Sequence, residues 1–203
     1  MNPHRLTLED AGRILDSGGV LILDTDTLPG FHCRADLVEA VRRIARIKGR
    51  SPDKPLLVLA ADLAQAGQIL GSMTRRQRNY CQSCWPGPFS LILPAACGLT
   101  AEVTAGSGTV AVRVPDQPAL RTLLQAVGHP LVSTSVNCEG QPPAANLDQA
   151  EAGFAALVDG VYGCSVQSPV AGSGPVASAL IDLTVWPPRL LRQGPLPAPL
   201  PGP

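Results

Sequence analysis

Aromatic side chains are scarce in this chain, and their scarcity limits how it could recognise a nucleic acid. Only three Phe, two Tyr and two Trp occur among 203 residues. Proteins that read unpaired bases stack them on exposed aromatic rings, so base recognition of that kind is not expected. The formal net charge is zero, so no overall field attracts a polyanion either. Any binding of an anion must therefore depend on a local group of cations.

The sequence also lacks the segments that insert a protein into a membrane. No apolar run approaches the ~20 residues that a membrane-spanning helix needs, and the first residues hold no apolar signal core. Six cysteines, at positions 33, 81, 84, 97, 138 and 164, are too scattered for a disulfide framework. The single C-x-x-C pair has no second pair to complete a zinc site. We therefore expect a cytoplasmic protein with reduced thiols and no membrane partner.

The common glycine-rich phosphate loops and histidine-based catalytic motifs are absent. The chain contains neither G-x-x-x-x-G-K-[ST] nor G-x-G-x-x-G after a strand, and neither H-E-x-x-H nor G-x-S-x-G. Histidine occurs only at positions 4, 32 and 129, so nucleophilic catalysis by histidine is not expected. A nucleotide would have to be held by side chains of Lys, Arg, Ser and Asn, with electrostatic clamping as the main catalytic device.

A cationic loop at 48–55 is the most informative segment that is present. An amphipathic helix over 36–48, with Asp36 as its cap, is predicted to end at Gly49, and the apolar run 56–60 predicts a buried strand. Cations are favourable at the end of a helix even without a ligand. A cationic loop that leads into a buried strand, however, lies at the rim of a sheet, where open α/β folds hold ligands. We expect its three cations, Lys48, Arg50 and Lys54, to bind an anion.

Helical and strand-like segments alternate along the chain, which predicts an α/β layer fold with a mixed β-sheet. A single domain is expected over 1–194, because a chain of this length can bury one core. Residues 195–203 are rich in proline and are expected to form a frayed, extended tail. Helices are predicted over 7–17, 36–48, 62–70, 74–84, 116–128 (capped by Asp116) and 146–157, and strands over 20–23, 56–60, 89–93, 109–114, 131–135, 179–183 and 189–192.

Alternation along the predicted strand 109–114 sorts its side chains onto two faces. Three valines share one face, whereas Thr109, Ala111 and Arg113 share the other. A hydroxyl, a methyl and a guanidinium would form a poor core. They are a suitable surface for an anionic ligand.

The predicted strand 131–135 ends in a second polar group. Alternation places Ser133, Ser135 and Asn137 on one side, where the chain enters a loop rich in Gly and Pro. Their donors and acceptors could bind a phosphate or a ribose, or could satisfy the following turn. The segment 24–27 alternates in the same way, with its threonines on one face and its aspartates on the other.

Six segments, taken in order, carry a family resemblance. They are D-T-D-T-L-P-G (24–30), I-K-G-R-S-P-D-K-P-L (47–56), W-P-G-P-F-S-L-I-L (85–93), T-V-A-V-R-V-P (109–115), P-L-V-S-T-S-V-N (130–137) and L-L-R-Q-G (190–194). Together they resemble the YrdC-like family of threonylcarbamoyl-adenylate synthases, in the order and spacing of that family. The resemblance implies a twisted mixed sheet that curls around a positively charged cavity. It also implies the short form, without the extra C-terminal domain of longer relatives.

The resemblance further implies a nucleotidyltransferase reaction. L-threonine, bicarbonate and ATP, with Mg²⁺, would give threonylcarbamoyl-AMP and pyrophosphate. A separate tRNA threonylcarbamoyl-transferase complex would use the product, and tRNA or double-stranded RNA is a further expected ligand. The implied catalytic residues are Lys48 and Arg50, the implied substrate-binding residues are Thr27, Lys54, Thr109, Arg113, Ser133, Ser135, Asn137 and Arg192, and no metal-binding residue is implied.

The sequence departs from the family pattern mainly on the amino-acid side of the cavity, whereas the phosphate side matches. The identity of the amino-acid substrate is therefore left open. The departures are Asp24 for a usual Pro, Pro29 for an aromatic residue, Leu59 for a threonine-contacting His, Pro143 for a Ser and Ala179 for a Thr.

Two other functions remain open at this stage. One is a non-catalytic relative that binds RNA or a nucleotide in the same cavity, which the missing aromatic residue at position 29 and the basic string at 75–78 favour. That string is more typical of the solvated face of a helix than of a binding surface. The other is a carbamoyl-transfer enzyme with a different acceptor.

Overall fold

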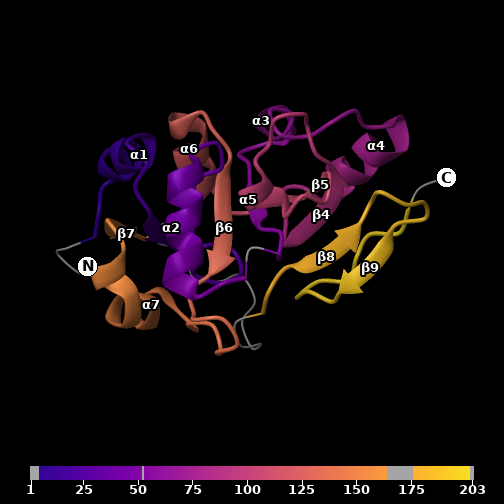
Figure 1. Cartoon of the computed structure of the whole chain (residues 1–203). Coiled ribbons are helices and arrows are strands. Elements are labelled where there is room, and N and C mark those ends of the chain that lie inside the picture. The colour runs from indigo at the N-terminus through magenta and orange to yellow at the C-terminus, as the bar shows by residue number, and fades with distance from the viewer. Residues whose placement is uncertain (1–4, 52, 164–175, 202–203) are drawn as a thin grey trace.

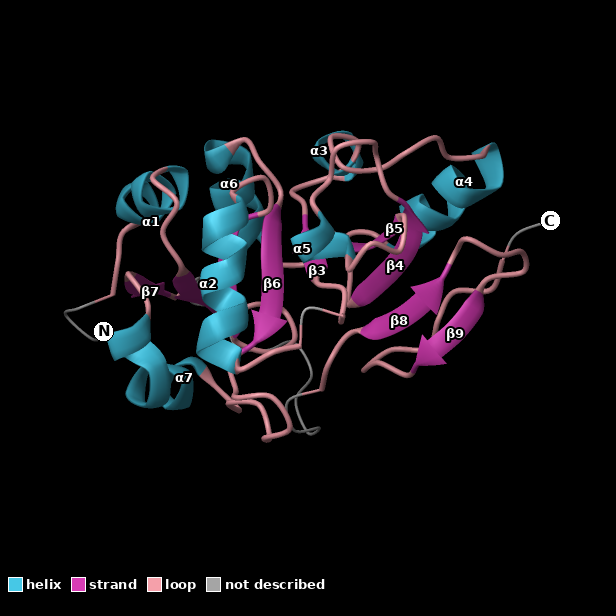
Figure 2. Ribbon diagram, viewed as in Figure 1, coloured by secondary structure: helices cyan, strands magenta, loops and turns pink. Residues whose placement is uncertain are grey.

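The computed structural model describes residues 5–51, 53–163 and 176–201, and its centre is one mixed sheet with helices on both faces (Figures 1 and 2). Neighbouring strands are parallel in three pairs and antiparallel elsewhere. The predicted mixed α/β fold is confirmed. In spatial order the described strands are β7 (Gly160–Tyr162), β1 (Leu21–Leu23), β2 (Gly30–Arg34), β6 (Leu131–Ser135), β3 (Leu57–Leu59), β5 (Thr109–Arg113), β4 (Phe89–Pro94), β8 (Ala179–Asp182) and β9 (Arg189–Arg192).

Each face of this sheet packs against one apolar cluster. Helices α1 (Leu8–Asp16) and α6 (Pro118–Val127) pack on each other and on β1, and Leu15 and Leu120 are fully buried between them. The helices of the other face contribute to a larger cluster around Phe31 and Ile44. They are α2 (Val38–Lys48), α4 (Arg75–Cys84), α5 (Ala101–Thr104) and α7 (Leu147–Phe154). Helix α3 (Leu63–Ala66) lies near β3 in the chain, and a 3₁₀ turn (Ala155–Leu157) follows α7.

Several helices begin where a side chain can accept from a free backbone N–H. The Thr7 hydroxyl accepts from Asp10 N at the start of α1. Thr74 and Gln77 form a reciprocal capping box at the start of α4. Asn146 accepts from the backbone N–H of Gln149 at the start of α7.

Two predicted caps are wrong. Helix α2 begins after Leu37 without a side-chain cap, because the Asp36 carboxylate is paired with Arg34, 2.8 Å away. Helix α6 begins after Gln117, and Asp116 contributes only its backbone N–H, which donates to Asp26. At Asp36 a charged partner takes the carboxylate that the local sequence assigns to the cap. At Asp116 the helix starts two residues later, with Pro118 in its first turn.

Some elements differ from the sequence prediction. Strands β2 and β7 and helix α5 were not predicted, and the helix predicted over 62–70 is reduced to α3. Residues 195–201 form no helix or strand, as expected, but the tail is not frayed there: the Tyr80 hydroxyl donates to Pro199 O at 2.9 Å, and Ala198 packs against the core. Residues 202 and 203 lie outside the described part of the chain.

Two glycines give a direct test of this packing. A Cβ on Gly194 would lie 2.2 Å from the backbone nitrogen of Ala179, whereas a Cβ on Gly12, inside α1, would meet nothing within 4 Å. We expect Gly194→Ala to lower the free energy of unfolding by roughly 2 kcal/mol or more, since the strand beginning at Ala179 must shift. Gly12→Ala should raise it by roughly 0.5 to 1 kcal/mol. Urea unfolding of both variants measures this, and an unchanged Gly194→Ala variant would contradict the described contact.

Candidate active site

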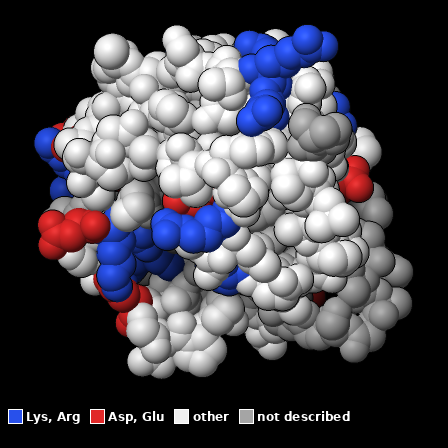
Figure 3. Space-filling view, turned by 90° about the vertical axis from the view of Figure 1, so that its right-hand side faces the viewer, with Lys and Arg blue, Asp and Glu red and all other residues white. Residues whose placement is uncertain are grey.

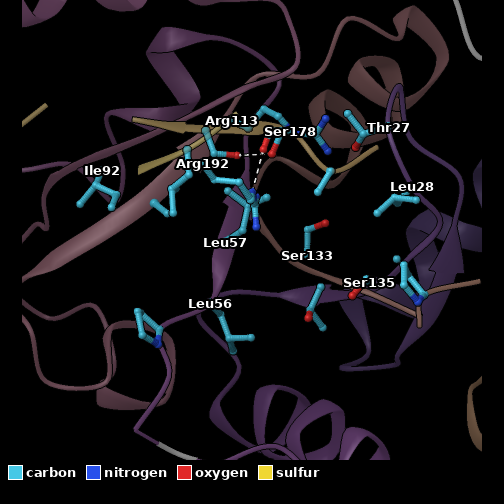
Figure 4. Close-up of a pocket in the computed structure, with 18 of the residues that line it drawn as sticks. Thr27, Leu28, Leu56, Leu57, Ile92, Arg113, Ser133, Ser135, Ser178 and Arg192 are labelled. Atoms are coloured by element: carbon cyan, nitrogen blue, oxygen red, sulfur yellow. Dashed lines mark hydrogen bonds between the residues drawn. The ribbon is translucent and has the colours of Figure 1, made fainter. Parts of the chain in front are cut away.

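A cavity of about 410 Å³ lies on the face of the sheet that carries α1 and α6, over the strands that these helices leave uncovered. Its floor is a row of residues paired across the sheet, Ser133 on β6, Leu57 on β3, Ala111 on β5 and Ile92 on β4. This volume is in the range of small-molecule sites. Figure 4 shows side chains from both halves of the chain pointing into it.

Three arginines from distant segments line this cavity: Arg50 after α2, Arg113 at the end of β5 and Arg192 at the end of β9. Among the residues that the structure describes, no Asp, Glu or His belongs to the lining. Burial lowers the pKa of Arg50 and of Arg192, and the charge of Arg113 adds to the effect at Arg192. Guanidinium groups remain charged despite such shifts. Arg113 is buried, Arg50 is partly buried and Arg192 stays exposed to solvent. Three cations without a lining carboxylate favour an anionic ligand.

A buried ion pair positions Arg113. Its Nη1 donates to Asp26 Oδ1 at 2.6 Å, and both side chains are only 2% exposed. Asp26 Oδ2 also accepts from Asp116 N at 3.0 Å, and Arg113 Nη2 donates to Thr25 Oγ1 at 3.4 Å. Arg113 Nε has no hydrogen-bond partner among the described residues. The pair and the Thr25 contact therefore use two of the five N–H donors of the guanidinium and hold it in place at the cavity wall.

The segment 24–27 does not behave as the alternation predicted. Thr25 and Thr27 do lie together, with their hydroxyl oxygens 3.1 Å apart. However, the segment is a loop, so Asp26 and Thr25 both contact Arg113 and do not occupy opposite faces. Strict alternation would place the Asp26 carboxylate away from the threonines, whereas it contacts the same guanidinium as Thr25.

Most of the sequence-predicted site residues meet in this cavity. The faces predicted for β5 are confirmed, because Ala111 lines the cavity whereas Val110 and Val112 are buried in the core. On β6 the prediction holds only in part, because Thr134, expected on the opposite face, also lines the cavity. The predicted residues that line it are Thr27, Arg50, Thr109, Arg113, Ser133, Ser135 and Arg192. Their shared location is established, and their individual roles toward a ligand stay predictions.

Lys48, Lys54 and Asn137 do not line the cavity as described. Lys48 is 4% exposed, and its Nζ donates to Asn137 O at 2.9 Å, to Asn137 Oδ1 at 2.8 Å and to Ser135 O. Burial, with the nearby charge of Arg50, lowers the pKa of Lys48 to about 8. Lys48 thus joins the end of α2 to the end of β6. Lys54 is paired with Glu139, whose carboxylate also accepts from Ser51 N.

Two serines that the sequence prediction missed also line the cavity. Ser90 Oγ and Ser178 Oγ are 2.8 Å apart and buried, and Arg192 Nε donates to Ser178 O at 3.0 Å. Alternation along 89–93 could have identified Ser90, which shares a face with Ile92. Ser178 precedes β8 and has no comparable signal. Among the departures from the family pattern, Pro143 lines the cavity, whereas Leu59 and Ala179 are fully buried outside it.

The described residues offer little to a metal ion or a redox reaction. No group of three or more His, Cys, Asp or Glu side chains in the described ranges could hold a metal ion. Cys81 and Cys84 are free and buried, and burial raises the pKa of these thiols to about 12 and about 11. None of the helices in these ranges is both long and apolar enough to span a membrane.

Comparison with known proteins places this cavity in a family. A family model described as "Telomere recombination", for the Sua5, YciO and YrdC proteins, matches residues 13–194. A Nitrosococcus oceani protein named threonylcarbamoyl-AMP synthase is 36% identical over 149 residues, which cover 73% of this chain and 80% of that protein. This chain belongs to the Sua5/YciO/YrdC family.

Solved structures agree with this assignment. The structure of P. abyssi Sua5 complexed with L-threonine matches with a TM-score of 0.85 and 28% identity, over 95% of this chain. This chain covers 56% of that chain, or about half its length. E. coli YciO matches with a TM-score of 0.79 over 93% of this chain and 89% of its own, and its 23% identity indicates the shared fold alone.

The contribution of the buried Arg113–Asp26 ion pair to stability can be compared with that of the exposed Arg42–Glu39 pair. We expect Asp26→Ala to lower the free energy of unfolding by roughly 3 to 5 kcal/mol, because it leaves the buried Arg113 charge without its partner. Glu39→Ala, which removes a carboxylate that is 75% exposed and paired with Arg42, should change stability by less than about 1 kcal/mol. Equal losses in urea unfolding would contradict the special role of the Asp26 pair.

Proposed function

We propose that this chain is a threonylcarbamoyl-AMP synthase, which joins L-threonine, bicarbonate and ATP to form threonylcarbamoyl-AMP and pyrophosphate. The observation that carries the proposal is the convergence of Arg50, Arg113 and Arg192 on one cavity without a carboxylate in the described lining. A triphosphate and an amino-acid carboxylate are both anions that such a cavity would bind. Relatives that are at least 30% identical over the aligned residues carry this enzyme name, and the P. abyssi structure holds L-threonine.

The proposed reaction needs binding and charge neutralisation more than covalent help from the protein. The amine of threonine attacks the carbon of CO₂, formed from bicarbonate by loss of hydroxide, and the new N–C bond gives a carbamate as the amine proton leaves with that hydroxide as water. A carbamate oxygen then attacks the α-phosphorus of ATP while the bond to the leaving pyrophosphate breaks. The arginines would offset the charge that grows on the pyrophosphate oxygens, and the cavity walls would hold the reactants together.

Mg²⁺ is proposed to enter with ATP as part of the substrate. Proteins hold Mg²⁺ through one or two carboxylates together with substrate phosphates. The described lining supplies no carboxylate, so it does not fit an ion held by the protein alone. The proposed bound form is therefore an ion carried on the phosphate oxygens of the nucleotide.

The remaining assignments follow from this function. We propose that a tRNA threonylcarbamoyl-transferase complex uses the product, and that tRNA or double-stranded RNA can bind this chain. A cytoplasmic location and a single domain over 1–194 are also proposed; the exposed free thiols Cys97 and Cys138 suit a reducing compartment. A non-catalytic RNA or nucleotide binder and a carbamoyl transferase with another acceptor are not favoured.

A direct assay tests the function. Purified protein with ATP, bicarbonate and Mg²⁺ should release pyrophosphate only when L-threonine is added, and mass spectrometry should detect threonylcarbamoyl-AMP. Serine and valine in place of threonine test whether the departures at positions 29 and 143 changed the amino acid. No pyrophosphate release with any amino acid, together with tight RNA binding, would overturn the proposal in favour of the binding protein.

Arg50→Ala tests the role of the cationic lining. We expect kcat to fall by about 100-fold, the scale measured when one preorganised charge-stabilising donor is removed. Arg46→Ala is the matched control, because Arg46 is exposed on α2, shortly before Arg50, and its loss should leave the rate unchanged. Equal rates for both variants would mean that Arg50 serves only to end the helix.

A further inference from the structure

One histidine next to the cavity, His32, has a buried ring nitrogen without a hydrogen-bond partner among the described residues. His32 on β2 is fully buried, and its Nδ1 lies 2.9 Å from Gly30 O. A carbonyl oxygen can only accept, so Nδ1 carries the proton and Nε2 presents a lone pair. Nε2 is buried and has no hydrogen-bond partner among the described residues. An unpartnered buried polar atom costs stability, so it calls for an explanation.

The ring of His32 lies directly behind the cavity wall. A Cβ on Gly30 would be 2.8 Å from His32 Cε1 and 3.3 Å from its Nε2, and Gly30 lines the cavity. The absence of a side chain at position 30 therefore makes room for the imidazole. Burial, with the nearby charge of Arg113, lowers the pKa of His32 to about 3, so the ring stays neutral at physiological pH.

Two serines of β6 lie opposite this ring on the same face of the sheet, and one of them, Ser135, faces Gly30 and already donates its hydroxyl to Asn137 Oδ1 at 2.6 Å. Ser133 is the other. His32 and Ser133 are register partners in the antiparallel pair of β2 and β6, and such partners have Cβ atoms roughly 4.5 to 5.5 Å apart. Ser133 lines the cavity yet is only 7% exposed, so its hydroxyl lies at the boundary between the cavity and the buried imidazole. Among the described residues this hydroxyl makes no hydrogen bond that would hold it in another direction. Figure 4 shows Ser133 between Arg113 and Ser135.

The chemistry of the lining makes an acceptor valuable at this point. Three arginines supply hydrogen-bond donors to the cavity, whereas no carboxylate lines it among the described residues. An amino-acid substrate brings an ammonium or amine group whose N–H bonds need acceptors. A serine hydroxyl that donates its proton to a buried acceptor can only accept from the ligand.

We propose that the His32 and Ser133 pair forms the amine-recognition subsite of the cavity: the Ser133 hydroxyl donates to His32 Nε2 and presents its lone pair to the amine of the amino-acid substrate. The two side chains face each other across the β2 and β6 pair, so the bond would form by rotation of the Ser133 side chain about its Cα–Cβ bond, a fast motion. Ser133 is then the residue that contacts the substrate, and His32 is a positioning residue. This inference rests on the proposed synthase function.

Kinetics of three variants test the subsite. Asn at position 32 keeps a donor near the place of Nδ1 and lacks the Nε2 acceptor, whereas Gln can offer an acceptor near the place of Nε2. We expect His32→Asn and Ser133→Ala each to raise KM for threonine about 10-fold, the scale of one net hydrogen bond, with KM for ATP unchanged. His32→Gln should recover most of the loss. The double variant His32→Asn with Ser133→Ala should be no worse than either single change, because the two act as one unit.

The control is Cys33→Ala, a buried change on the same strand whose side chain packs in the cluster on the opposite face. It should leave KM for threonine unchanged even if the melting temperature falls. Equal increases of KM for ATP and threonine in His32→Asn, or additive effects in the double variant, would overturn the proposal.

A second measurement does not depend on activity. The chain has three histidines, so the ¹⁵N resonances of its imidazoles can be assigned in labelled protein. We expect His32 to show a protonated Nδ1 and an unprotonated Nε2, and Ser133→Ala to shift the Nε2 resonance of His32 while leaving that of His129 in place. A protonated Nε2, or no shift on replacing Ser133, would refute the pair. If the wild type releases no pyrophosphate, the synthase proposal fails, and this measurement still decides whether the pair exists.

Discussion

The buried ion pair between Arg113 and Asp26 is the interaction on which the site depends. Its attraction counters the cost of removing a guanidinium from water. Asp116 N donates to the second oxygen of Asp26, and Arg113 also donates to Thr25. Because Asp26 lies on the loop after β1 and Arg113 ends β5, the pair also joins two distant parts of the sheet. The cavity thereby keeps a cation at its wall while the balancing carboxylate remains behind it.

A similar division recurs around the cavity. Lys48 is used internally, where its ammonium group gathers oxygens from the end of β6 and fixes the backbone that carries Ser135. Arg192 donates to the backbone oxygen of Ser178, and the hydroxyl of the same serine is hydrogen-bonded to that of Ser90. Some cations therefore shape the site and others face the ligand. On the side of the molecule that carries β8 and β9, Lys and Arg are gathered in a few groups between large uncharged areas (Figure 3).

Much of the fold could be predicted from sequence where local signals agree. Thr7, Thr74 and Asn146 each cap a helix, and alternation in 109–114 correctly separates the cavity face from the core face. Prediction failed where tertiary partners decide. The segment 30–34 was not predicted as a strand, because Gly30 and His32 interrupt its apolar pattern. It becomes β2 by pairing with β1 on one side and with β6 on the other. Likewise, nothing in the loop 48–55 reveals that Glu139, far along the chain, pairs with Lys54.

The proposed function depends on an anion that the arginines of one cavity hold. A crystal structure of the protein with ATP and L-threonine measures this most directly. The account predicts phosphate oxygens within hydrogen-bond distance of Arg50 and of at least one of Arg113 and Arg192, with the Asp26 pair intact behind them. A nucleotide bound outside this cavity, or one whose phosphates contact none of these guanidinium groups, would contradict it.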